Sequence, residues 1–539
     1  MDGAPARLDT KLGRVITVSG SQIIMLLERG ASDGERTTEP ALQIGALVKM
    51  LTPSSTLFGL VAGLNIPMPA QHSTDVEMRL VELELIGETA HCEDESRRRF
   101  QRGVSAFPAL GDGVFIATPE DLALVYRTNS PSAVRIGTVH QDRSLPAYVV
   151  ADDLLGKHFA ILGSTGSGKS CAIALILRAL LADHRHGHVV LLDMHNEYAR
   201  AFGDAALVLD PGKLDLPYWL FTYEELEEIV LGGSKDRQVE GAILAEVVQT
   251  AKRLSALTQE KAEVKLDTPV PYRMGEVIRL IDEAAGKLDK APDTSPYLHL
   301  KARLQALQAD TRFSFMFPGV TVRDNMAEIL STLFRIPVRG KPVTIIDLSS
   351  VPSEVLNVVV SVLCRMTFDF GLWSDQSAPI LLVCEEAHRY CPLETKTAFE
   401  PAKRALSRIA KEGRKYGVSL CLVSQRPSEL SSTILSQCNT IFALRMSHQS
   451  DQEYVRGALP EAAVALLDFL PALRNAEAIA IGEGVPVPVR LCFDELAEEF
   501  RPHSGTAPFA RAWSSEMKDN GFLKSVVERW RRQRRAPRD

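Results

Sequence analysis

Residues 161–180 read ILGSTGSGKSCAIALILRAL, which is the end of an apolar strand pattern, a glycine-rich turn and an apolar helix pattern. The turn matches GxxxxGK[ST] at every fixed position, and a preceding strand with a following helix is the context that this motif requires. Glycines let consecutive backbone N–H groups converge on one anion, and the helix N-terminus adds the positive end of its dipole. The stretch therefore predicts a nucleoside triphosphate site formed by Gly163, Ser164, Thr165, Gly166, Ser167, Gly168, Lys169, Ser170 and Cys171.

Two side chains of this turn have distinct expected roles. Lys169 would reach the β- and γ-phosphates as the main positive charge of the site. The hydroxyl of Ser170 would bind Mg²⁺. The turn therefore predicts a nucleoside triphosphate and Mg²⁺ as cofactors, and the family resemblance described below implies that the triphosphate is ATP.

A pair of glutamates at the end of another apolar strand could supply the acidic groups that a triphosphate site needs. Residues 379–388 read PILLVCEEAH, so the apolar run ends at Glu385 and Glu386. In a parallel sheet the carboxyl ends of the strands gather at one edge, where both carboxylates can reach the phosphates. We expect Glu385 to support Mg²⁺ and Glu386 to orient the attacking water as the base. The alternative is an acidic strand end without a catalytic role.

Polar residues at two more strand ends are candidates for the same site. Asp193 ends the strand in LLDMHNEY (191–198), and Gln425 follows the strand in LVSQRP (422–427), where it would sense the γ-phosphate. A turn that Asp193 caps at the start of a helix would give the same pattern, so that alternative stays open.

Two arginines in SRIAKEGRKYG (407–417) complete the set of candidate catalytic residues. Arginine suits the charge that develops in phosphoryl transfer because its guanidinium is planar, always ionised and multidentate. Arg408 or Arg414 could have this role, and either could instead be a surface arginine of a helix.

The hydrophobic pattern changes several times along the chain. Short β-rich runs with Gly and Pro turns before residue 150 predict a small barrel or sandwich. From Lys157 onward, buried strand patterns separated by helices predict a mostly parallel, doubly wound α/β sheet. The expected domains are 1–150 (β-barrel), 151–221 and 331–500 (two parts of the α/β core), 222–330 (inserted helical subdomain) and 501–539 (a C-terminal extension with a basic tail).

Composition limits the class of protein. The chain has 539 residues, 45% apolar and 24% charged, which is ordinary for a soluble globular protein of about three domains. Uninterrupted apolar runs of membrane-spanning length and a secretory leader are not evident, so we expect a cytoplasmic protein without a membrane partner. The eight cysteines form no CxxC pair and are expected to be reduced thiols. The net charge of −7 argues against a uniformly DNA-coating surface but leaves room for a local basic channel.

Five motifs, in one order, resemble those of the HerA family of hexameric DNA translocases, relatives of FtsK. They are GSTGSGKS, DMHNEY, CEEAH, RIAKEGRKYGV and VSQRPSELSSTILSQCNTIFALRM, and the resemblance covers about residues 11–500. Met194 and Asn196 stand where the family motif has Pro and Gly, which should alter the turn and keep the chemistry. The resemblance implies a RecA-like P-loop NTPase core, an N-terminal β-barrel of the HAS type and a helical insertion.

The resemblance also implies a function. It implies an ATP-driven motor in which a ring of subunits, expected to be a hexamer, holds double-stranded DNA in its central channel. Arg408 or Arg414 would then project into the ATP site of a neighbouring subunit. The partner would be a separate nuclease or a sirtuin-like effector protein, in DNA-end processing or antiviral defence. An ATP-regulated scaffold ring that activates a toxic effector, with little translocation, stays open as the alternative.

Overall fold

The structure is a computed structural model, and the part of the chain that it describes falls into two compact units. The first unit contains Met1–Asp183, Ser424–Ser428 and Leu435–Glu495, and the second contains His184–Val423, Glu429–Ile434 and Leu496–Asp539. The described residues are 10–28, 42–67, 78–91, 98–232, 237–255, 263–287, 294–317, 322–393, 400–459, 461–503, 509–514 and 520–531.

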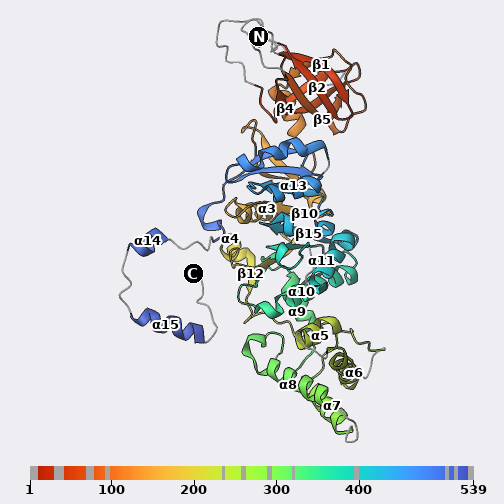
Figure 1. Cartoon of the computed structure of the whole chain (residues 1–539), viewed down its shortest axis with the longest axis vertical. Helices are drawn as coiled ribbons and strands as arrows, with labels where there is room; N and C mark the ends of the chain where they lie inside the picture. The colour runs from red at the N-terminus through yellow and green to blue at the C-terminus, as the bar shows by residue number, and fades with distance from the viewer. Residues whose placement is uncertain are drawn as a thin grey trace. The chain divides into compact units, whose positions relative to one another are not determined.

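The first unit begins with a closed antiparallel barrel (Figure 1). Its strands follow the order β2-β1-β7-β3-β4-β5, and a pairing between β2 and β5 closes the barrel, while β6 adds to β5 at one side. Alternating strand residues such as Val15, Ile23 and Val48 fill its interior. The bounds are β1 (Lys11–Ser19), β2 (Gln22–Leu27), β3 (Leu47–Leu51), β4 (Ser55–Asn65), β5 (Leu80–Ala90), β6 (Phe100–Arg102) and β7 (Gly113–Ile116). The predicted N-terminal β-barrel is confirmed.

A second sheet of the first unit has the strand order β10-β16-β17-β18-β8-β9. Only β10 and β16 are parallel, and the other neighbours are antiparallel. The bounds are β8 (Ala133–Val139), β9 (Pro146–Val150), β10 (Phe159–Leu162), β16 (Thr440–Leu444), β17 (Glu477–Gly482) and β18 (Val489–Phe493), with helices α1 (Pro119–Tyr126), α2 (Ala151–Leu155), α3 (Lys169–Asp183) and α13 (Gln449–Gly457).

Two features of this second sheet differ from our expectation. Residues 133–150 form β8 and β9, which join the β17–β18 hairpin, whereas we expected them in the barrel. The sequence analysis also did not recognise β17 and β18. Short alternating strands carry no information about which sheet they will join, because the pairing depends on residues far away in the sequence.

One arginine of the barrel donates hydrogen bonds to the β17–β18 hairpin. The guanidinium of Arg102 on β6 donates to the backbone oxygens of Pro486 at 2.6 Å and Gly482 at 2.8 Å, and also to that of Val485. These contacts tie the barrel to the second sheet within the first unit.

The second unit contains a fully parallel sheet with the strand order β12-β13-β11-β14-β15. Its strands are β11 (His188–Asp193), β12 (Ala206–Leu209), β13 (Val343–Asp347), β14 (Ile380–Cys384) and β15 (Val418–Ser424), of which the last residue belongs to the first unit. The non-sequential order requires crossover helices, and it confirms the predicted doubly wound α/β core. We had not predicted β12, which has only four residues.

The longest helix of the second unit is a core helix. α10 (Ser353–Trp373) has the length and the mean hydropathy, 1.6, of a membrane span, yet 72% of its apolar window is buried within the protein. The other helices near the sheet are α4 (Ala199–Phe202), α9 (Met326–Phe334), α11 (Glu400–Glu412) and α12 (Ser432–Leu435).

A run of helices lies between β12 and β13 in the chain, as the predicted helical insertion requires. It comprises α5 (Tyr223–Leu231), α6 (Arg237–Leu254), α7 (Met274–Lys287) and α8 (Ser295–Ala309). Figure 1 shows α7 and α8 side by side in green. The chain continues after the sheets into α14 (Phe509–Trp513) and α15 (Asn520–Arg531), and the last part of the basic tail, 532–539, lies outside the described residues.

Candidate nucleotide site

The glycine-rich turn of the first unit has the geometry of a phosphate cradle. β10 ends at Leu162, and α3 begins at Lys169. Gly166 and Gly168 have φ angles of +75° and +100°, which any other residue would adopt only with strain. The Lys169 ammonium donates to the backbone oxygen of Ser164 at 3.0 Å, so its side chain lies over the turn. These residues fit a bound triphosphate because the turn presents N–H groups, a helix N-terminus and a cation at one place.

Neighbouring strands fix the path of this turn. The backbone N–H of Gly163 donates to Ser424 at 3.3 Å, and that of Ser164 donates to Arg445 at 2.9 Å. A Cβ atom on Gly163 would lie only 2.8 Å from the Ser167 hydroxyl oxygen, so a side chain at this position would displace the turn. The first glycine of the motif is therefore required by packing as well as by its approach to the phosphates.

The expected γ-phosphate sensor lies against the same turn. The Thr165 hydroxyl donates to the side-chain amide oxygen of Gln425, which directly follows β15. Gln425 is half-buried. The structure thus joins two residues that are 260 positions apart in the sequence.

A buried carboxylate pair ends β14 in the second unit. The carboxylate of Glu385 accepts a hydrogen bond from the Tyr198 hydroxyl at 3.1 Å and one from the Met194 backbone N–H at 3.3 Å. Burial raises the pKa of Glu385 well above its ordinary value, and the negative charge of Asp193 adds to this effect. A carboxyl group in this environment gains from a nearby cation, because a cation would stabilise its ionised form.

Glu386 has a different backbone conformation from the strand that precedes it. Its φ is +49°, in the left-handed region, and a non-glycine residue is held there only by its surroundings. Its side chain is buried, and one carboxylate oxygen lies 3.3 Å from Nδ1 of His388. The carboxylates of Glu385 and Glu386 therefore have different contacts, the first with Tyr198 and Met194 and the second with His388. The contact with His388 was not predicted from the sequence.

Asp193 organises the turn after β11. Its carboxylate accepts backbone hydrogen bonds from His195 at 3.1 Å, Glu197 at 2.9 Å and Tyr198 at 3.1 Å. Burial raises the pKa of Asp193, although these N–H groups lower it in part. Asp193 therefore organises the turn that precedes α4, and this turn positions Tyr198 beside Glu385.

The two candidate arginines do not contact these carboxylates. Arg414 lies just before β15, and the first residue of β15 pairs with Ile380, the first residue of β14. Arg414 is therefore at the amino end of these strands. Glu385 follows the last residue of β14 and is at their carboxyl end. At about 3.3 Å per residue, the five residues of β14 separate the two ends of the sheet by about 17 Å. Arg414 is exposed at the amino end of the sheet, so it lies far from the carboxylates of its own chain.

Arg408 lies on α11 and packs against α10. Its guanidinium carbon lies 4.1 Å from the centre of the Phe368 ring, and one nitrogen is 3.8 Å from the Asp369 carboxylate. The side chain is still 49% exposed. Arg408 is therefore held in one orientation by a cation–π contact while its guanidinium remains accessible to another molecule.

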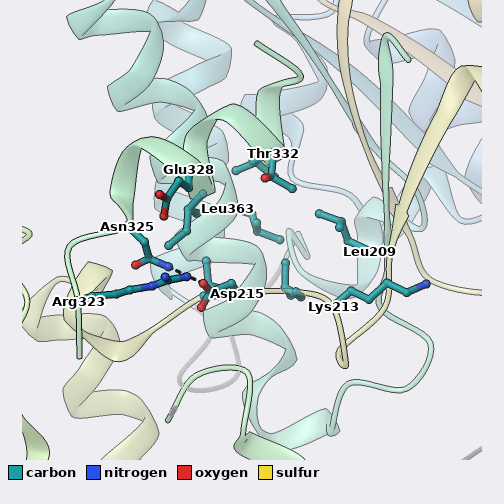
Figure 2. Close-up of a pocket in the computed structure, with 12 residues that line it drawn as sticks. Leu209, Lys213, Asp215, Arg323, Asn325, Glu328, Thr332 and Leu363 are labelled. Carbon is teal, nitrogen blue, oxygen red and sulfur yellow. Dashed lines mark hydrogen bonds between the residues drawn. The ribbon is translucent and has the colours of Figure 1, made fainter. Parts of the chain in front are cut away.

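A cavity of about 150 Å³ in the second unit involves none of the predicted site residues. Figure 2 shows Asn325 donating to Asp215, at 2.6 Å, with Arg323 beside them. The side chains that line the cavity include both acidic and basic residues, and its lining contains no glycine-rich turn. The cavity therefore does not resemble the phosphate cradle of the first unit.

A glycine-rich phosphate-binding turn between a strand and a helix is the defining feature of a P-loop NTPase. The parallel sheet of the second unit, with its crossover order, has the form of a RecA-like core. Residues 134–367 match the family model described as "Helicase HerA, central domain". The DNA double-strand break repair helicase HerA of Pyrococcus furiosus is 26% identical over 469 residues, which are 79% of this chain and 78% of that protein. The protein of the same name from Sulfolobus acidocaldarius is 26% identical over 434 residues, 78% of this chain and 80% of that protein. The chain is thus similar to HerA helicases over most of its length.

Two solved structures are similar to this chain. VirB4 of Thermoanaerobacter pseudethanolicus has a TM-score of 0.48 at 16% identity, covering 69% of this chain and 99% of that one. The bacterial conjugative coupling protein TrwB has a TM-score of 0.45 at 15% identity, covering 71% of this chain and 93% of that one.

Proposed function

We propose that this protein hydrolyses ATP to move along double-stranded DNA as a ring of identical subunits. The observation that carries the proposal is the phosphate cradle at Gly163–Lys169 in a chain whose relatives are named DNA double-strand break repair helicases. The ring, expected to be a hexamer, and DNA in its channel are what the resemblance to this family implies.

The P-loop and the carboxylates act, in this proposal, on one nucleotide. The similarity to HerA helicases over most of the chain, which includes both units, supports it. Lys169 binds the β- and γ-phosphates, and Gln425 contacts the γ-phosphate. Ser170 and Glu385 would hold Mg²⁺, which would supply positive charge to neutralise the phosphates.

Glu386 is the general base of this proposal. Its carboxylate accepts the proton of the water that attacks the γ-phosphate, and its contact with His388 orients it for that step. Asp193 is a positioning residue, because it holds the turn that brings Tyr198 to Glu385.

One arginine of each subunit completes the site of its neighbour. The distance of Arg414 from the carboxylates of its own chain, and the exposed guanidinium of Arg408, both support action in trans. Such an arrangement makes hydrolysis depend on ring assembly.

The test measures ATP hydrolysis and DNA translocation by the purified full chain with and without linear double-stranded DNA. We expect DNA to stimulate hydrolysis, and Lys169→Ala to abolish it, while Lys213→Ala, an exposed lysine beside Asp210, retains it. Normal turnover in the Lys169→Ala protein would contradict the site. Hydrolysis that responds to a partner protein and not to DNA would favour the scaffold alternative.

The proposal includes a separate nuclease or effector as the partner, in DNA-end processing or antiviral defence. Within the described residues there is no cluster of three or more His, Cys, Asp or Glu side chains that could hold a metal ion, as many nucleases require. Purified chain should consume ATP and leave linear DNA uncut. Cutting by the chain alone would contradict this part of the proposal.

A further inference from the structure

A short turn before β17 lies against the phosphate cradle. β17 runs antiparallel to β16, with Ala478 opposite Leu444 at the carboxyl end of β16, so residues 474–476 lie at the same edge of the sheet as the P-loop. A Cβ atom on Gly168 would lie 3.6 Å from the backbone nitrogen of Ala476. The turn therefore passes close to the last glycine of the P-loop.

The turn is built rigidly around a buried carboxylate. Glu477 is 2% exposed, and it accepts hydrogen bonds from the Arg490 side chain at 2.8 Å and the Arg474 backbone N–H at 3.2 Å. Burial alone would raise the pKa of Glu477, but these hydrogen bonds lower it below its ordinary value. Ala476 has a φ of +64°, and its backbone oxygen accepts a hydrogen bond from Phe493 at 2.8 Å. The carboxylate thus fixes a backbone conformation that alanine adopts only with strain.

The side chains at the tip of this turn are exposed although the backbone beneath them is fixed. Arg474 and Asn475, the two residues before Ala476, are both exposed. Gln425 contacts Thr165 near the start of the P-loop, whereas Ala476 contacts Gly168 at its end, where α3 begins. The backbone N–H groups at a helix start bind the α- and β-phosphates, so the ribose and base of a nucleotide extend from this end of the turn.

We propose that Arg474 and Asn475 bind the nucleoside part of the triphosphate, with Asn475 reading the edge of the base. A side-chain amide offers a donor and an acceptor together, which matches the N6 and N7 edge of adenine. A guanidinium is planar and stacks on aromatic rings, and it also donates to ribose hydroxyls. This inference rests on the proposed nucleotide site and adds the group that selects the nucleoside.

The test compares two ligands that share their phosphates. The full-length Arg474→Ala/Asn475→Ala protein is titrated calorimetrically, in Mg²⁺, with a non-hydrolysable ATP analogue and with inorganic tripolyphosphate. We expect affinity for the analogue to fall by about tenfold or more, since hydrogen bonds to the nucleoside are lost, while affinity for tripolyphosphate stays unchanged. An Arg127→Ala/Asn129→Ala control removes the same side-chain types from an exposed segment of the same unit and should change neither affinity.

Two results would overturn the inference. An unchanged affinity for the analogue would show that the turn does not touch the nucleoside. An equal loss for both ligands would show that the turn only supports the P-loop. Wild-type protein that binds neither ligand would instead refute the proposed nucleotide site, so the two failures are distinguishable. In the single Asn475→Ala protein, the preference for ATP over GTP should shrink, and an unchanged preference would exclude base reading by Asn475.

Discussion

Removing the hydroxyl of Tyr198 should weaken the contribution of Mg²⁺ to ATP hydrolysis. That hydroxyl donates to the buried carboxylate of Glu385 at 3.1 Å. A hydrogen bond to a charged group contributes about 1.5–3 kcal/mol, and about 1.4 kcal/mol corresponds to tenfold in an equilibrium constant. Because the bond stabilises the ionised form of Glu385, its loss makes that carboxylate harder to ionise. In the Tyr198→Phe protein, the Mg²⁺ concentration for half-maximal hydrolysis should therefore rise about tenfold.

A second tyrosine provides a matched control. The Tyr390 hydroxyl donates to the backbone oxygen of Glu385 at 2.7 Å and not to its carboxylate. Tyr198 and Tyr390 are both fully buried, so Tyr390→Phe removes the same atom from a similar environment. Steady-state hydrolysis is measured over a Mg²⁺ titration at saturating ATP, with thermal unfolding as a check on folding. An equal Mg²⁺ dependence in the two variants, or no change in Tyr198→Phe, would refute the role given to Glu385.

The remaining predictions concern the base, the arginines and the barrel. Glu386→Gln should bind ATP and retain it unhydrolysed, because only the activation of water is lost; wild-type turnover would favour Glu385 as the base. Arg408→Ala or Arg414→Ala should lower hydrolysis by about 10³-fold or more, and mixing the inactive arginine variant with Glu386→Gln should restore activity if the arginine acts in trans. Failure to restore it in proven mixed rings would place that arginine in its own subunit's site. Burial raises the pKa of Glu84 from 4.5 to about 7, so the folded state holds this proton more tightly than the unfolded state does. The free energy of unfolding should therefore fall by up to about 3 kcal/mol as the pH rises from 4.5 to 7. In urea unfolding, Glu84→Gln should therefore be more stable than wild type at pH 8 and nearly equal to it at pH 4.5, and a constant difference would contradict the assignment.

The parts of the fold that could be predicted from the sequence are those with strong local patterns. The apolar runs of β10, β11, β13, β14, β15 and β16 are buried on both faces, and such strands are recognisable without knowledge of their partners. The P-loop could be predicted for a similar reason, since its glycines are required by backbone geometry at Gly166 and Gly168.

Features that depend on distant residues could not be predicted. The carboxylate of Asp193 accepts hydrogen bonds from three following N–H groups, and the pattern of residue types does not show these bonds. The contact of Tyr198 with Glu385 joins residues 187 positions apart. The turn at 474–476 contains no motif, and only its approach to Gly168 gives it significance.

The hydrogen bonds from Arg102 to the β17–β18 hairpin limit which changes of sequence the hairpin can accept. All three of its acceptors are main-chain oxygens, those of Gly482, Val485 and Pro486. A main-chain oxygen is present whatever the side chain is, so these hydrogen bonds do not themselves require particular residue types. Gly482 is required for a separate reason, because a Cβ atom there would lie 2.0 Å from the backbone oxygen of Asn439. Inserting or deleting one residue between 482 and 486 would move the oxygens out of register with the guanidinium. The hairpin should therefore resist changes of length, whereas most surface loops tolerate insertions and deletions.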